Sequence, residues 1–206
     1  MEKNLSLVAD QEKAPDVGDP TFDALTSDYD KCVDHLEAED TQFWRRTICR
    51  TIFSMFEAMN GLLREKAVEA LCSADKKSRN ITRIELLSGN EWRILKDGKL
   101  EQQRLRRPFL NYTAFILRAF AEESNSEPTF FADSGWNDFQ KAVEVRHRLT
   151  HPKKNTDMNV SDAELTSLHE AVRWYCNAAA TVLNNKTFWT GPTREHIPPL
   201  QSGLSA

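Results

Sequence analysis

The feature that most constrains the fold is a series of apolar residues spaced three and four apart between residues 43 and 73. An α-helix has about 3.6 residues per turn, so this spacing brings the apolar side chains onto one face. A pattern of this length predicts a long amphipathic helix whose apolar face is covered by other elements. The chain has only 7 glycines, which also favours helix. The stripe consists of Ile48, Ile52, Met55, Phe56, Met59, Leu63, Ala67 and Ala70.

Three more helices and one hairpin are expected. Pro108 suits the first turn of a helix that runs to about residue 122, and a third helix covers about 134–151. Ser161 and Glu164 have the spacing of a capping box at the start of a helix that reaches about residue 185. That last helix is apolar on two nearly opposite sides, so it lies centrally in a bundle or is covered by a partner. The Asp97-Gly98 pair predicts a small β-hairpin inserted at about 90–105.

The charge distribution divides the chain into three parts. Residues 1–40 contain 12 acidic and 3 basic residues, a net charge of −9, so the remainder carries +5 although the whole chain is at −4. We expect a flexible acidic segment over 1–40, a helical domain over 41–186 and an irregular, proline-containing tail over 187–206. The acidic segment is either a solvated leader or an electrostatic inhibitor of a basic site in the same chain.

Several classes of protein do not fit the sequence. No apolar run has the length of a signal peptide or a membrane span, so no membrane association is expected. The 4 cysteines form no CxxC pair, which indicates a reduced, cytoplasmic protein. The basic body leaves nucleic acid open as a partner.

The segment VEVRHRLTHPKK, residues 143–154, concentrates positive charge at the end of the third predicted helix. Cations at a helix C-terminus are favourable in themselves, and Pro152 is an ordinary stop signal. However, the phase set by the apolar residues of this helix places Arg146 on the buried face, where a guanidinium needs a partner or a solvated cleft. His151 precedes Pro152 and is therefore biased out of the helix, so it can turn back toward the same cleft. An arginine and a histidine together suit metal-free phosphodiester chemistry.

The spacing Arg146-His147-x-x-x-His151 resembles the R-polar-x3-H motif of the HEPN superfamily. FEAMNGLL, with Glu57 and Asn60, is similar to the flank of the long first helix in that family, and the architecture is similar over about residues 43–185. The resemblance implies an all-α fold, a HEPN-like four- or five-helix bundle, with the hairpin as a small insertion.

The resemblance also implies a function and a set of residues. Arg146 would bind the scissile phosphate, His151 would act as general acid or base, and His147 would orient them or contact RNA. The chain would be a metal-independent endoribonuclease that leaves a 2′,3′-cyclic phosphate and a 5′-hydroxyl, with no cofactor. Two copies would form a homodimer with facing motifs, acting as a toxin or phage-defence effector with a possible antitoxin or regulatory partner. Further RNA contacts are expected from Arg148, Lys153 and Lys154, and support of the site from Glu57 and Asn60.

Alternative functions remain open. The chain could be a non-catalytic HEPN dimer that binds RNA or another protein, or a small helical RNA-binding protein whose basic helix end only holds phosphate. His147 and His151 also have the i,i+4 spacing of two zinc ligands, with His169 or a carboxylate as a third. No HExxH pattern accompanies them, so a metal site is not expected.

Overall fold

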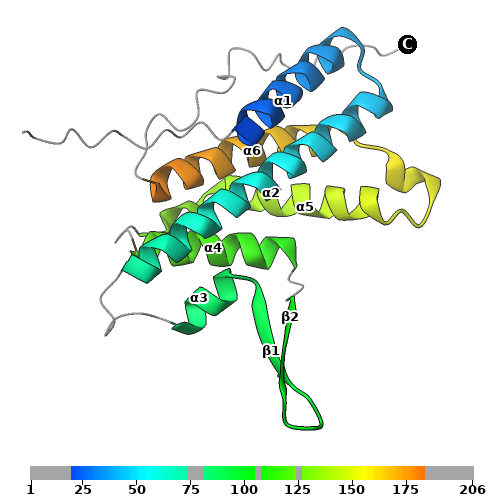
Figure 1. The fold of residues 1–206 in the computed structure, drawn as a ribbon. Helices are drawn as coiled ribbons and strands as arrows, with labels where there is room; N and C mark the ends of the chain where they lie inside the picture. Colours follow the sequence, from blue (N-terminus) through cyan, green and yellow to red (C-terminus); the bar gives the residue numbers. More distant parts are fainter. Residues whose placement is uncertain (1–19, 74–80, 105–107, 124–126, 184–206) are drawn as a thin grey trace, which may run out of the picture.

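The computed structural model describes residues 20–73, 81–104, 108–123 and 127–183 (Figure 1). This part of the chain is mostly helical and matches the expected all-α class. None of its helices is long and apolar enough to span a lipid bilayer. The predicted tail, 187–206, and the first 19 residues lie outside the described residues.

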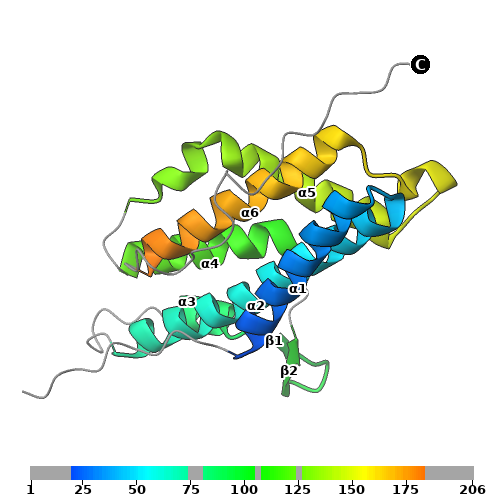
Figure 2. The same cartoon turned by 90° about the horizontal axis from the view of Figure 1, so that it is seen from above.

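The long helix α2, Gln42–Ser73, is the centre of the fold. The predicted apolar stripe is confirmed, since all of its residues except the half-buried Ala70 are buried. α2 contacts each of the other five α-helices that are described. The other described α-helices therefore lie against one continuous helix, which can be followed in Figures 1 and 2.

The expectation of a flexible segment over residues 1–40 is wrong for its second half. Helix α1, Pro20–Ala38, packs along α2 and buries the side chains of Tyr29 and Cys32. Leu25, Tyr29, Cys32 and Leu36 recur at intervals of four and three, so this acidic segment carries a helical apolar stripe of its own.

The hairpin is confirmed as an insertion between helices. After the short helix α3, Ile81–Leu87, strand β1, Asn90–Ile94, pairs antiparallel with β2, Leu100–Arg104. Gly98 has a φ of 78°, a left-handed conformation that suits glycine in the turn. The hairpin extends away from the bundle in Figure 1. Its last strand pair, Ile94 and Leu100, is exposed.

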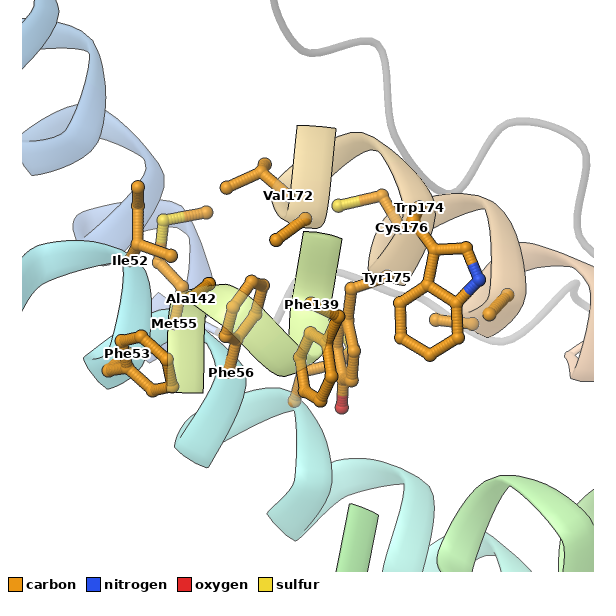
Figure 3. Packing of buried hydrophobic residues seen from close by; sticks show 14 of the residues in the cluster. Ile52, Phe53, Met55, Phe56, Phe139, Ala142, Val172, Trp174, Tyr175 and Cys176 are labelled. Carbon is orange, nitrogen blue, oxygen red and sulfur yellow. The ribbon is translucent and has the colours of Figure 1, made fainter. Parts of the chain in front are cut away.

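Helices α4, Phe109–Glu123, α5, Ser134–Thr150, and α6, Asp162–Val182, complete the bundle. Short 3-10 turns, η1 at Thr129–Ala132 and η2 at Asn155–Met158, precede α5 and α6. The capping box at the start of α6 is present: the Ser161 hydroxyl accepts from the Glu164 amide, and the Glu164 carboxylate accepts from the Ser161 amide. Aromatic rings from α2, α5 and α6 meet in the core, where the Phe56 ring lies 5.2 Å from that of Phe139 and 4.8 Å from that of Tyr175 (Figure 3).

The second apolar side of α6 is covered within the same chain. Trp174 lies against η1, and its indole N–H donates to the carbonyl of Phe130 at 2.8 Å. A Cβ at Gly135 would come within 2.6 Å of the Trp174 Cβ, so the start of α5 can approach α6 this closely only with glycine. A second subunit is therefore not needed to explain why α6 is apolar on two sides.

Candidate functional site

The motif histidines lie together at the C-terminal end of α5. His151 is the C-cap residue, with φ −128° and ψ 60°, and its N–H still donates to the carbonyl of His147 at 3.0 Å. This bond keeps the two residues one helical turn apart on the same side, so their ring centroids are 5.2 Å apart at 61°. Both side chains are exposed. The arrangement presents two imidazoles to solvent at one place.

Arg146 points toward α2 and α4 instead. Its Nη2 lies 2.5 Å from the Glu57 carboxylate, and its guanidinium carbon is 5.3 Å from the Phe53 ring centroid and 5.5 Å from that of Phe109. The side chain keeps 37% of its area exposed. A guanidinium on the inward side of α5 needs a partner, and for Arg146 this partner is Glu57. The two aromatic rings lie below the cation.

Arg146 and His151 are not brought into contact. The structure shows no hydrogen bond or ion pair between these two residues, both of which are described. Their side chains leave α5 in different directions, because five residues correspond to about 140° around a helix. Sequence reasoning expects one cleft shared by the arginine and the histidine, whereas the structure forms two neighbouring pairs, Arg146 with Glu57 and His147 with His151.

Arg148, expected to contact RNA, is used inside the chain. Its Nη1 donates to the carbonyls of Asp157 and Asn159, both at 2.7 Å, and its Nη2 lies 2.6 Å from Glu164. The planar guanidinium thereby joins the end of α5, the turn η2 and the start of α6.

The two lysines after Pro152 are held by their backbone. The Asp157 carboxylate accepts the amide N–H of Lys153 at 2.8 Å and that of Lys154 at 3.1 Å. These hydrogen bonds hold the pKa of the Asp157 carboxyl below its usual range, and the bond from the Lys153 amide has the larger effect. Both lysine side chains are exposed, so their positive charges remain available to an anionic ligand.

Asn60, expected to support the site, lies in the core. Its amide oxygen accepts from the Tyr175 hydroxyl at 2.7 Å, and its amide nitrogen donates to the Thr113 hydroxyl at 2.8 Å. The side chain joins α2, α4 and α6 and is 6% exposed. Of the two α2 residues predicted to support the site, only Glu57 contacts a motif residue.

Arginines near the start of α2 were not expected to take part in this region. The Nη1 of Arg46 donates to the carbonyl of Met158 in η2 at 3.2 Å, and Arg50 is exposed one turn further on. Arginines in the first turns of a helix oppose its dipole, which is the signal that could have identified them in the segment RRTICR.

The thiol of Cys49 is buried in α2 beside Arg50, its neighbour in the sequence. Burial raises its pKa to about 12, while the positive charges of Arg146, Arg50 and Arg148 act in the opposite direction.

The third histidine considered as a metal ligand has a different partner. The Nδ1 of His169 lies 3.0 Å from the hydroxyl oxygen of the buried Tyr29. Within the described ranges, no group of three or more His, Cys, Asp or Glu residues is placed to hold a metal ion.

Comparison of the chain with family models, with curated proteins and with solved structures found no match. The chemistry of the site therefore rests on its own residues.

Proposed function

We propose that this chain is a metal-independent endoribonuclease of HEPN type, with His147, His151 and Arg146 as its catalytic residues. The observation that supports the proposal best is the pair of exposed imidazoles whose ring centroids are 5.2 Å apart. Cleavage of RNA without a metal needs one group to remove a proton and another to supply one. Two neighbouring imidazoles can fill both roles near neutral pH.

The proposed reaction uses the ribose of the substrate as the nucleophile. A neutral His151 imidazole takes the proton of the 2′-hydroxyl, and the 2′-oxygen attacks the adjacent phosphorus. The bond from phosphorus to the 5′-oxygen breaks, and a protonated His147 gives its proton to that oxygen. The products are a 2′,3′-cyclic phosphate and a 5′-hydroxyl, and the two histidines have exchanged their protonation states.

Arg146 would bind the phosphate that carries the developing negative charge. One edge of its guanidinium is used by Glu57, but an arginine has five N–H donors, so the others can reach a phosphate oxygen. Glu57 then orients the guanidinium above the Phe53 and Phe109 rings. The exposed Lys153 and Lys154 would attract the RNA backbone.

The partners of the enzyme follow from the same proposal. We infer that two copies form a homodimer with their α5 ends facing, because this arrangement would double the positive charge presented to RNA. In that setting the protein would act as a cytoplasmic toxin or phage-defence effector, with an antitoxin or another regulatory protein as a possible partner.

A non-catalytic RNA-binding module is the second candidate, and one observation favours it. Arg146 is already paired with Glu57 and packed on two rings, which are contacts that a structural cation also makes. In this function the basic end of α5 would bind RNA and leave it intact.

RNA cleavage in EDTA separates these functions. Wild-type protein, His151→Ala and Arg146→Ala are incubated with single-stranded RNA, and the product ends are analysed. We expect wild type to leave cyclic phosphate ends, His151→Ala to lose at least 100-fold in rate, as for removal of a general base (~10²), and Arg146→Ala to lose both rate and affinity. His35→Ala, an exposed histidine on α1, is the matched control and should cleave normally.

Binding without cleavage by wild type would instead establish the second candidate. Cleavage that needs added zinc or magnesium, or that survives in His151→Ala, would contradict the proposed mechanism.

A further inference from the structure

The side of α2 that faces the end of α5 carries a row of residues at helical spacing. Arg46, Arg50, Phe53 and Glu57 follow one another at intervals of four, three and four, so they form a ridge along one side of the helix. Below, this set is called the α2 ridge.

Contacts at both ends of the α2 ridge fix what lies opposite it. At one end, the Arg46 guanidinium donates to the carbonyl of Met158 in η2. At the other, Arg146 of α5 lies over the Phe53 ring and pairs with Glu57. Arg50 stands between these two contacts, and its side chain is exposed. It therefore lines the same seam between α2 and α5 as Arg146.

The charges in this seam weaken the attraction of Arg146 for a phosphate. The carboxylate of Glu57 neutralises the guanidinium it contacts, so a phosphodiester that approaches Arg146 meets a pair of zero net charge. A second cation within reach would restore the attraction. Arg50 has no carboxylate partner among the described ion pairs, and it stands on the same side of α2 as Phe53 and Glu57, which Arg146 contacts.

We propose that Arg50 is a substrate-binding residue that holds an RNA phosphate beside Arg146. This inference rests on the proposed function and extends it, because it assigns the substrate path to the seam between α2 and α5. The strand would run along the α2 ridge from η2, near Lys153 and Lys154, toward Arg146. The aromatic ring of Phe53 lies below this path and is itself buried, so the contact is made to the backbone of the RNA rather than to its bases.

The test measures binding of an RNA that cannot be cleaved. A fluorescein-labelled single-stranded RNA with 2′-O-methyl riboses is titrated with the full chain at several salt concentrations, and Kd is read from anisotropy. We expect Arg50→Gln to weaken binding about tenfold, since a hydrogen bond to a charged group is lost. The slope of log K against log salt should fall by about 0.7, the value for one phosphate contact on a single strand.

Two variants make the result specific. Lys66→Gln removes one positive charge from an exposed position on the same helix, about 24 Å from Arg50 at 1.5 Å per residue, and should bind as wild type does. Arg50→Lys keeps the charge and should retain the salt slope while losing part of the affinity. Circular dichroism of each variant shows that the fold is kept, as expected for an exposed residue.

The outcomes distinguish the inference from the proposed function. If wild type binds RNA and Arg50→Gln binds as well as Lys66→Gln does, the inference is overturned and the proposed function stands. If wild type does not bind the RNA at any salt concentration, both fail.

Discussion

At the scale of single residues, the buried side chain of Asn60 lies between two hydroxyl groups. Its amide oxygen accepts from Tyr175 on α6, and its amide nitrogen donates to Thr113 on α4. Both polar atoms of the Asn60 amide are hydrogen-bonded although they are removed from water, which is the condition under which polar groups are tolerated in a core. The amide thus determines how three helices meet.

Removal of this amide should be costly. Asn60→Ala leaves the hydroxyls of Tyr175 and Thr113 without the amide between them and opens a small cavity, so we expect a loss of about 1–3 kcal/mol in the free energy of unfolding. Urea denaturation measures it. Asn177→Ala, an exposed asparagine of α6, is the control and should change stability by less than about 0.5 kcal/mol. Equal stability of the two variants would show that the Asn60 amide is not essential to the packing.

Residues near one another in the sequence differ in how well their surroundings can be predicted. The inward direction of Arg146 follows from the phase of α5, because helical periodicity alone determines which side a residue faces. The partners of Arg148 could not be predicted in this way. They are backbone carbonyls of Asp157 and Asn159, and their positions depend on the path of η2 in three dimensions.

At the scale of elements, the turn η2 is held by side chains of α5 and α2 and by its own carboxylate. The Arg148 guanidinium of α5 binds the Asp157 carbonyl in η2, the Asn159 carbonyl just after it and Glu164, and Arg46 of α2 donates to the Met158 carbonyl. The Asp157 carboxylate binds the amides of Lys153 and Lys154. The segment after His151 contains few buried apolar residues, apart from Val160, so these polar contacts supply most of its order.

Loss of the Arg148 contacts should therefore loosen one segment only. In Arg148→Met we expect faster amide hydrogen exchange at residues 153–160, with unchanged exchange in the middle of α2. Arg173→Met, which removes an arginine that pairs with Glu170 on the surface of α6, is the control. Unchanged exchange in 153–160 would mean that Arg148 does not order this turn.

An element can be predicted from the sequence when its periodic pattern and its amino-acid composition indicate the same structure. α2, α4, α5, α6 and the hairpin carry clear periodicity, caps or turn residues, and the structure confirms them. α1 was missed because its apolar stripe is set among many acidic residues, which indicated a solvated chain. The coverage of Trp174 by η1 could not be foreseen either, because Phe130 lies 44 residues away in the sequence and the contact depends on the tertiary fold.

At the scale of the whole molecule, the attachment of α1 to the bundle includes one titratable pair. Tyr29 on α1 is hydrogen-bonded to His169 on α6 at 3.0 Å. Burial lowers the pKa of His169 to about 4, and the charge of Arg173 acts in the same direction. The folded protein therefore favours the neutral imidazole.

This pair predicts how stability changes with pH. The unfolded chain binds a proton at His169 near pH 6.5, whereas the folded chain does so only near pH 4. The neutral His169 therefore makes its full contribution to the free energy of unfolding above pH 6.5. That contribution is lost as the pH falls from 6.5 toward 4. Urea unfolding at a series of pH values should show this decline, and His169→Gln should flatten it. A slope in this window that is the same in both proteins would assign the decline to other groups.

The central position of α2 has a consequence for how the protein denatures. Each of the five other described α-helices contacts it, although α5 and α6 also pack closely against each other. Melting of α2 would therefore expose part of the buried surface of every one of these helices at once. Intrinsic fluorescence, which reports on the five tryptophans of the chain, and far-ultraviolet circular dichroism, which reports on helix, should accordingly follow the same single curve during chemical unfolding.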